Sequence, residues 1–258
     1  MEFSEYSHKY RNIKMVRDNG ILELIFHTDG DSLRWTHVGG AHSEFASAFA
    51  DIGRDPENHV VIMSGTGAEY SGPRASEDEP MPGTAENWDI IQRNGIAITM
   101  GLLNIDAPII SCINGPALRH PEVPLLADIV LASDTAFIQD SAHFINRVVP
   151  GDGINVIMPL LMGYTRGRYF LLTGQKIDAT EALQLGLVNE IHPQEDLLPR
   201  ARELANELIK QNLLVLRYTR RLLTHPLKKA MHDILGYGLA LEGLAYIHEQ
   251  SQSSTNNR

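Results

Sequence analysis

Along the first two thirds of the chain, short apolar runs alternate with longer segments in which apolar residues recur every three to four positions. Short runs bounded by turn residues are typical of buried strands, and the longer periodic segments are typical of helices. This alternation predicts right-handed strand–helix–strand crossovers and a largely parallel sheet. The predicted strands span 13–18, 21–27, 59–64, 108–113, 128–132, 135–139 and 187–191, and the predicted helical segments span 41–52, 85–105, 153–172 and 179–185.

Two connections stand out between these elements. Asp18-Asn19-Gly20 separates the first two strands and predicts a tight hairpin turn. The segment 65–83 is long, acidic and rich in glycine, and long loops of this kind in compact proteins are often functional.

The last third of the chain predicts only helices, over 195–210, 213–223 and 228–249. Their apolar faces need cover from the core or from another subunit, and we expect a subunit interface. The chain then divides into a core at 1–195, a C-terminal helical region at 196–250 and a disordered tail at 251–258.

Composition narrows the class of protein without naming its chemistry. The chain has 258 residues, 43% of them hydrophobic, and a formal charge of −10, which argues against nucleic acid or an anionic membrane as partner. There is no signal peptide or membrane-spanning run at the sequence level. The single cysteine, Cys112, lies in an apolar run and fits a cytoplasmic protein without disulfides, and no metal-binding motif is present.

An unusual polar group precedes one of the predicted strands. Arg119-His120-Pro121-Glu122 stands shortly before the apolar run 128–132, at the edge of what the pattern predicts to be core. One interpretation is a plain polar turn. The other is a site in which the His120 imidazole donates a hydrogen bond to a developing oxyanion.

Three motifs give the chain a resemblance to the crotonase (enoyl-CoA hydratase/isomerase) superfamily, over roughly residues 13–225. They are VVIMSGTGAEYSG at 60–72, INGPAL at 113–118 followed by ADIVLAS at 127–133, and VPGDG at 149–153 followed by LTGQKIDATEALQLGLVNEI at 172–191. The resemblance implies an α/β fold with a ββα spiral core, a C-terminal helical trimerisation region, and a homotrimer or dimer of trimers.

The chain departs from that family at its functional positions. The glycines of the usual second oxyanion loop are replaced by Arg119-His120-Pro121, and proline has no N–H to offer a thioester oxygen. In the first loop, Gly72-Pro73-Arg74-Ala75 stands in place of the usual pattern. His143 occupies the position of a catalytic glutamate of the hydratases.

These departures resemble one branch, that of 6-oxocamphor hydrolase and related β-diketone hydrolases. The shared features include SLRWT at 32–36, the HPE stretch at 120–122, the QD and HF pairs around His143, and RGRYFLLTGQ at 166–175. The resemblance implies hydrolysis of a C–C bond in a cyclic β-diketone by a retro-Claisen reaction. It implies water as the nucleophile, an alicyclic diketone as the partner, and neither CoA nor another cofactor.

Five residues are candidates for the chemistry. His143 is suited to act as a general base, Asp152 to accept from its other ring nitrogen, and His120 to stabilise the oxyanion. By resemblance His42 and Glu242 belong to the same group, although a helix-surface histidine and an interface glutamate are equally simple interpretations. Asp152 in turn is compatible with an ordinary Gly-Asp-Gly turn.

Four aromatic residues are candidates for binding the substrate. The indole N–H of Trp35 could donate to a carbonyl while its ring forms an apolar wall, and a plain core tryptophan is the alternative. The other three candidates for the pocket lining are Tyr70, Trp88 and Phe144.

Two other functions remain open at this stage. An acyl-CoA hydratase, isomerase or hydrolase could use Glu122 with His143 or Asp152, since a shared fold does not fix the function. A non-catalytic crotonase-like protein could serve as an assembly partner.

Overall fold

The computed structural model describes residues 1–36, 39–72 and 84–256, so the part of the predicted long loop from 73 to 83 lies outside the described residues. The described residues form a six-stranded sheet in the order β1-β2-β3-β4-β5-β8. β1 and β2 are antiparallel, and all the other neighbouring pairs of strands, from β2–β3 to β5–β8, are parallel. These strands are β1 Ile13–Asp18, β2 Ile21–Phe26, β3 Val60–Ser64, β4 Ile109–Ile113, β5 Ile129–Ser133 and β8 Glu190–His192.

The predicted hairpin and the predicted edge strand are both confirmed. Asn19 and Gly20 adopt φ of 46° and 78°, the left-handed conformation that a two-residue turn between right-twisted strands needs. The run 187–191 contributes β8, which closes one edge of the sheet. A separate pair of short strands is formed by β6 (Phe137–Ile138) and β7 (Ile177–Asp178).

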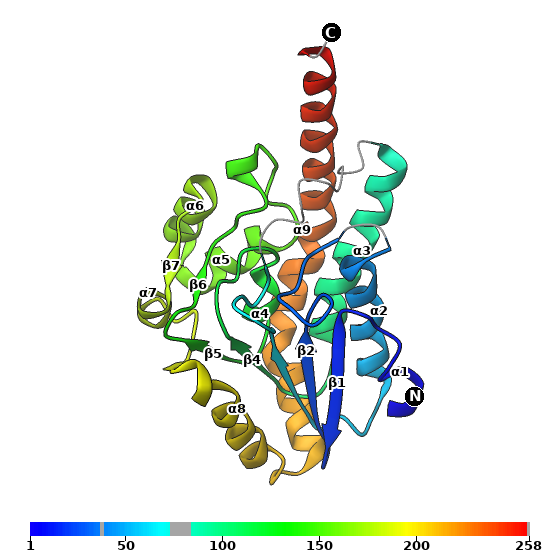
Figure 1. Ribbon diagram of the computed structural model, residues 1–258, viewed down its shortest axis with the longest axis vertical. Coiled ribbons are helices and arrows are strands. Elements are labelled where there is room, and N and C mark those ends of the chain that lie inside the picture. The colour runs from blue at the N-terminus through cyan, green and yellow to red at the C-terminus, as the bar shows by residue number, and fades with distance from the viewer. Residues whose placement is uncertain (37–38, 73–83, 257–258) are drawn as a thin grey trace.

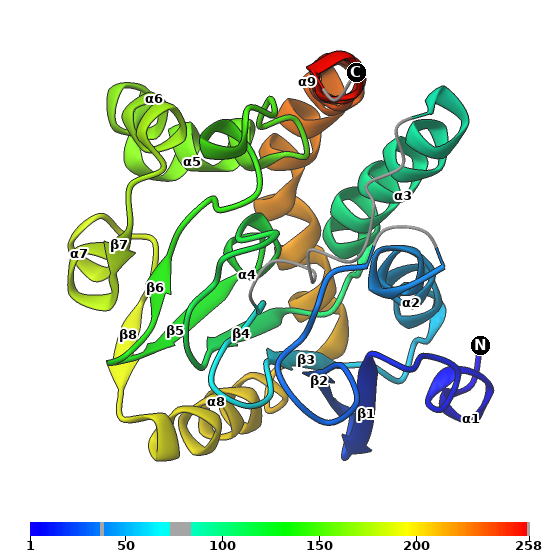
Figure 2. The same ribbon diagram turned by 45° about the horizontal axis from the view of Figure 1, so that its top comes forward.

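Helices cover both faces of the central strands, which explains why β3, β4 and β5 are apolar without alternation, whereas the edge strand β1 alternates buried and exposed residues. On one face, α8 (Gln194–Leu208) packs Leu197, Ala201 and Ala205 against alternate strand residues such as Val60 and Cys112. On the other face lie α2 (Ala41–Arg54), α3 (Ala85–Asn104), α4 (Glu122–Leu125) and α5 (Ile154–Met162), with α9 (Leu213–Asn256) behind them (Figures 1 and 2). The remaining helical elements are α1 (Phe3–Tyr6), the 3-10 turn Phe144–Asn146, α6 (Tyr164–Thr173) and α7 (Ala179–Gln184).

The C-terminal helices differ from the prediction. The segments predicted at 213–223 and 228–249 form one helix, α9, which continues through Pro226 and reaches Asn256, so the described residues of the predicted tail are helical. An internal proline costs a helix about 3 kcal/mol. Burial of Arg220 before Pro226, and of Met231 and Leu235 after it, fixes both halves against the core and offsets that cost. None of the helices in the described part of the chain has the length and apolarity that a bilayer crossing requires.

The parallel strands place their connecting loops at one edge of the sheet. The loop after β3, the loop after β4 that carries His120, and the long connection from β5 through β6 to α5 all leave the carboxyl ends of strands. In open α/β sheets, ligands bind outside these carboxyl ends. The fold therefore gathers the candidate residues at the edge where a site is expected.

Candidate active site

His120 occupies a strained position between β4 and α4. Its φ is 49°, a left-handed conformation that a side chain larger than glycine rarely adopts, and it stands where the family pattern has glycines. Strain of this kind costs on the order of 1–3 kcal/mol and tends to occur at functional sites. The surroundings hold His120 there, because its carbonyl accepts from Val123 as α4 begins and its ring packs on Trp35 with centroids 4.3 Å apart.

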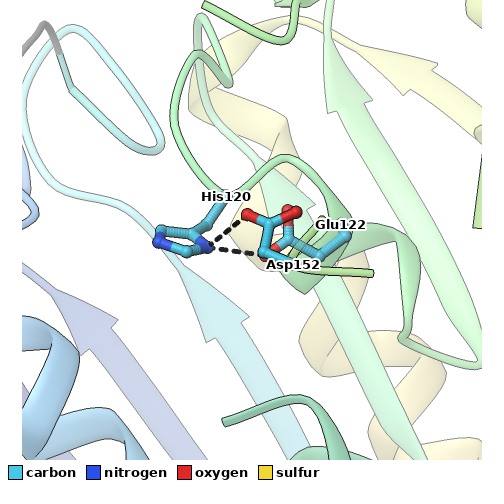
Figure 3. Close-up of side chains that lie close together, drawn as sticks. All are labelled: His120, Glu122 and Asp152. Atoms are coloured by element: carbon cyan, nitrogen blue, oxygen red, sulfur yellow. Dashed lines mark hydrogen bonds and ion pairs between the residues drawn. The ribbon is translucent and has the colours of Figure 1, made fainter. Parts of the chain in front are cut away.

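Two carboxylates meet one nitrogen of the His120 ring. Nδ1 lies 2.7 Å from Oε1 of Glu122 and 3.2 Å from Oδ2 of Asp152, while the other ring nitrogen points away from both (Figure 3). Burial alone would lower the pKa of this imidazole, but Glu122 and Asp152 outweigh that effect and raise the pKa to about 9. His120 is therefore an imidazolium at neutral pH, and its second N–H is directed away from the carboxylates.

His143 is held between three carboxylates. Its Nδ1 lies 2.8 Å from Oδ1 of Asp140, and its Nε2 lies 3.4 Å from Oε1 of Glu242 and 3.5 Å from Oδ2 of Asp152. Burial lowers the pKa of the imidazole, and the three carboxylates together raise the pKa well above 6.5.

The geometry corrects the predicted role of Asp152. The carboxylate at Nδ1 of His143 is that of Asp140, since Asp140 precedes His143 by three residues in the same loop and its side chain folds back onto the ring. Asp152 instead lies between the two imidazoles, in contact with Nδ1 of His120 and facing Nε2 of His143.

A close approach of two glycines brings α9 to this loop. A Cβ built on Gly238 would lie 2.5 Å from the carbonyl oxygen of Gly151, so only glycine permits the two backbones to come so near. Gly151 is adjacent to Asp152, and Glu242 lies one helical turn after Gly238. This contact places Glu242 over His143, although the two are about a hundred residues apart in sequence.

The carboxyl groups respond to this crowding in different directions. Burial, together with the charge of Asp152, raises the pKa of Glu122 to about 7. Burial also raises the pKa of Glu242, against the influence of His143. Burial alone would raise the pKa of Asp152, but the imidazoliums of His143 and His120 outweigh burial and bring this pKa well below its ordinary value. We call these four carboxyl groups and two imidazoles the imidazole cluster: His120, Glu122, Asp140, His143, Asp152 and Glu242.

The imidazole cluster borders a cavity of about 40 Å³, room for a few water molecules. A larger hollow of about 340 Å³ between the hairpin and α8 has no imidazole in its lining, so chemistry rather than size identifies the site. The polar wall of the smaller cavity contains His42, Arg119, His120, His143, Asp152 and Glu242. The apolar wall contains Trp88, Ile91, Ala142, Val148 and Leu239.

The structure brings two further predicted residues to the lining of this cavity and places a third beside His120. His42, buried at the start of α2, lines it with its ring centroid 5.3 Å from that of His120. Trp35 is buried beside His120, and its Nε1–H has no hydrogen-bond partner within the described residues. Trp88 lines the apolar wall, but its Nε1–H donates to the carbonyl of Leu239 on α9 at 2.9 Å.

Two predicted pocket residues lie elsewhere. Tyr70 is fully buried in the core, where its hydroxyl lies 3.4 Å from that of Ser111 and its ring packs on Phe26. Phe144 is about half exposed and is absent from the cavity lining. Spacing in the sequence shows that both are near the motifs, but it does not show which way their side chains point.

Asp140 is the residue that the sequence reasoning missed, and Glu122 was considered only for an acyl-CoA enzyme. Both stand two or three residues from a histidine, as in 120-HPE-122 and 140-DSAH-143. A carboxylate so close in sequence to a histidine is the local signal that could have found them.

One subset of the imidazole cluster has the composition of a metal site. Nδ1 of His120 and one carboxylate oxygen each from Glu122 and Asp152 lie within 4.8 Å of one another (Figure 3). A metal needs the unprotonated imidazole. The two carboxylates raise the pKa of His120 to about 9, so a metal would have to displace the proton of this imidazole.

The fold and the cavity define an α/β protein of crotonase architecture whose polar wall is built on imidazoles. The model of the enoyl-CoA hydratase/isomerase family matches residues 40–254, and the chain belongs to this family. A curated relative, the carnitinyl-CoA dehydratase of Shigella flexneri, is 29% identical over 201 residues, 77% of this chain and 74% of its own.

Solved structures place the chain within the family. It is similar to a β-diketone hydrolase from the cyanobacterium Anabaena sp. PCC 7120, solved with (S)-3-oxocyclohexyl acetic acid bound, at 43% identity and a TM-score of 0.92, over 95% of this chain and 98% of that one. An enoyl-CoA hydratase/isomerase from Mycobacterium paratuberculosis shares the fold at 22% identity and a TM-score of 0.84, over 93% and 96% of the two chains. The chain thus falls in the β-diketone hydrolase branch of the crotonase superfamily.

Proposed function

We propose that the protein hydrolyses a C–C bond of a cyclic or bicyclic β-diketone by a retro-Claisen reaction, giving a keto acid, and so acts on carbon–carbon bonds in ketonic substances. The observation that carries this proposal is the convergence of two imidazoles, the buried His143 and the largely buried His120, on one cavity whose lining also contains apolar side chains. The similarity to the cyanobacterial β-diketone hydrolase supports it.

The first step is the addition of water to one carbonyl. A water molecule at Nε2 of His143 would also face the carboxylates of Asp152 and Glu242, which lie 3.5 and 3.4 Å from that nitrogen. Neutral His143 takes a proton from this water as the oxygen attacks the carbonyl carbon. Because the carboxylates raise the pKa of His143, its neutral form is a stronger base than an ordinary imidazole, and the rate should rise with pH as more of this neutral form is present.

The second step breaks the bond between the attacked carbon and the carbon that separates the two carbonyls. The electron pair leaves as the enolate of the second ketone, which is why a 1,3-dicarbonyl is required. Donation from the free N–H of the His120 imidazolium and from Nε1–H of Trp35 stabilises the oxygens that gain charge. The proton held by His143 returns to the enolate carbon and completes the keto acid.

The backbone around the site argues against a thioester substrate. The N–H of Gly72 donates to Leu33 at 2.8 Å, the N–H of Leu118 donates to Ser71 at 3.2 Å, and Pro121 has none. These amides are therefore not free to bind a thioester oxygen, and we propose that CoA is not used. Since the cavity is smaller than a bicyclic ring, side chains of the apolar wall must shift outward when the substrate binds.

Turnover of two substrates tests this proposal. A bicyclic octane dione and crotonyl-CoA are each incubated with the protein, and the loss of absorbance is followed. We expect cleavage of the diketone only, and a fall in kcat of about 10³-fold or more for His143→Ala. Unchanged diketone turnover in His143→Ala would remove the proposed base and favour a non-catalytic role.

An acyl-CoA reaction is the second candidate, and two observations favour it. Glu122 and Asp152 form a buried pair of carboxyl groups, and the curated relatives of about 30% identity include carnitinyl-CoA dehydratases. Hydration of crotonyl-CoA without cleavage of the diketone would establish this function in place of ours.

We also propose that the protein forms a homotrimer or a dimer of trimers. Supporting this is a row of exposed large apolar side chains on α9, where an isolated subunit leaves them in water. Light scattering on the purified protein measures the mass directly, and a monomer at micromolar concentration would contradict the proposal. These exposed side chains are Leu214, Val215, Tyr218, Leu222, Leu223, Ile234, Tyr237 and Leu244.

A further inference from the structure

Asp140 makes three contacts within its own loop, and two of them are with His143. Its Oδ1 lies 2.8 Å from Nδ1 of His143 and also accepts the backbone N–H groups of Ala142 and His143, at 3.2 and 3.3 Å. Both side chains are buried. The turn therefore fixes the carboxylate, and the carboxylate fixes the plane of the ring.

This contact decides which ring nitrogen can act. A carboxylate accepts hydrogen bonds, so the ring proton is stabilised on Nδ1. Nε2 is then the nitrogen that can lose or gain a proton, and it is the one that faces Asp152 and Glu242 at the cavity.

The neighbouring imidazole is built in the same way. Glu122 lies two residues from His120 and contacts its Nδ1 at 2.7 Å, leaving the other nitrogen directed away (Figure 3). Each histidine thus has a carboxylate from its own loop at Nδ1. Asp152, which belongs to a different loop, lies between the two rings.

We propose that Asp140 is a positioning residue that holds the proton of His143 on Nδ1 and so makes Nε2 the nitrogen that exchanges a proton with water. The catalytic part of this inference rests on the proposed diketone hydrolysis, but the position of the proton does not. Asp152 is then free to face the attacking water instead of orienting the ring.

Other charged groups also face His143 and must be considered when its titration is read. Asp140 belongs to its own loop, Asp152 comes from the loop before α5, and Glu242 comes from α9. Asp152 contacts both His120 and His143, so the charge of His120 also acts on this part of the site. Arg119 and His42 line the same cavity. Asp140→Asn removes one of the three carboxylates and leaves the other groups in place.

The test is Asp140→Asn, followed by ¹⁵N NMR of histidine-labelled protein and by the pH dependence of kcat/KM on the bicyclic diketone. The spectrum of His143→Gln assigns the signal of His143 among the 11 histidines. In the wild type we expect the neutral ring to carry its proton on Nδ1. In Asp140→Asn we expect the proton to move to Nε2 or the pKa of His143 to fall, and kcat to drop about 10²- to 10⁴-fold.

Asp55 offers a matched control for a purely structural effect. Like Asp140 it is buried and accepts a backbone N–H two residues on, from Glu57 at 3.0 Å. Its side-chain partners are Tyr6 and Arg17, which lie outside the imidazole cluster. Asp55→Asn should lower the melting temperature and leave the NMR signal of His143 and the pH profile unchanged.

The outcomes separate the two proposals. If the wild type does not cleave the diketone, the proposed function fails, and the nitrogen signals of His143 still decide the role of Asp140. If Asp140→Asn leaves both the proton position and the pKa of His143 as in the wild type, the positioning role is overturned, whatever the activity.

Discussion

Two of the clusters of buried charge among the described residues are built differently. In the first, Arg220 of α9 directs Nε to Oδ2 of Asp128 at 2.6 Å, and its other nitrogens donate to backbone carbonyls at the end of α3. The same Asp128 oxygen accepts the N–H of Ile109 at 2.7 Å. We call this the arginine cluster; its accepting carbonyls belong to Leu102, Leu103 and Ile105.

In the imidazole cluster, several carboxylate oxygens lack a hydrogen-bond donor from the described part of the chain. Two imidazoles face four carboxyl groups, and within the described residues Oε2 of Glu122, Oδ2 of Asp140 and Oε2 of Glu242 have no hydrogen-bond donor. The arginine cluster pairs one cation with one carboxylate and satisfies its donors, as a group that only joins elements must. Unsatisfied oxygens next to a cavity instead leave capacity for water and substrate. The comparison separates charge that holds the fold from charge available for chemistry.

Removing the arginine should have the largest effect on stability. In Arg220→Met the carboxylate of Asp128 stays partly buried without its cation, and the helix end of α3 loses three donors. We expect the free energy of unfolding to fall by about 3–5 kcal/mol, measured by urea denaturation. The adjacent Arg221, about half exposed and paired with Asp106, is the control, since Arg221→Met should cost less than about 1 kcal/mol. Equal losses in the two variants would contradict the comparison.

The second largest expected effect is a dependence of stability on pH that comes from the imidazole cluster. The pKa of His120 is about 9 in the folded protein and 6.5 when unperturbed, so its contribution is complete below pH 6.5 and is lost as the pH rises through 9. Glu122, whose pKa is raised from 4.5 to about 7, acts in the same direction at lower pH. We expect the free energy of unfolding to fall by about 2–3 kcal/mol between pH 6.5 and 9.

His120→Asn is the control for this profile, because it removes one of the two imidazoles with a raised pKa and should make the decline less steep, while His143 still contributes. Arginine does not titrate in this range, so the arginine cluster contributes nothing to the slope. A wild-type profile as flat as that of His120→Asn would show that the folded protein does not stabilise the imidazolium.

The strands and the site differ in how far they follow from the sequence. Local apolar runs predicted every strand of the six-stranded sheet, most directly β3, β4 and β5, which are covered on both faces, but they did not predict β7 at Ile177–Asp178. The continuity of α9 through Pro226 could not be predicted, since the packing that offsets the proline comes from other elements.

For the site, the resemblance brought His120, His143, Asp152 and Glu242 to one cavity, where the structure also places them. It could not show which carboxylate meets which nitrogen. The Nδ1 contact of Asp140 depends on how one loop folds back, and no periodicity encodes this. The prediction that Tyr70 and Phe144 line the pocket was wrong, because proximity in sequence does not determine the direction in which a side chain points.

The contact between Gly151 and Gly238 joins the two regions compared above, since α9 carries both Arg220 and Glu242. In Gly238→Ala the added methyl group meets the carbonyl oxygen of Gly151, and α9 must move away from the loop of Asp152. We expect a loss of about 1–2 kcal/mol in the free energy of unfolding and a fall in kcat of about 10-fold, because Glu242 shifts from Nε2 of His143.

A second glycine of the same helix gives this prediction its control. A Cβ on Gly236 meets nothing within 4 Å, so Gly236→Ala should only raise helix propensity and stabilise the protein by about 0.5–1 kcal/mol, with kcat unchanged. Urea denaturation and diketone turnover of both variants distinguish the positions. Opposite signs in stability would show that the two backbones touch as described. If Gly238→Ala instead loses stability but keeps its full kcat, the placement of Glu242 by this contact has no part in turnover, and the imidazole cluster must be fixed by its own loops alone.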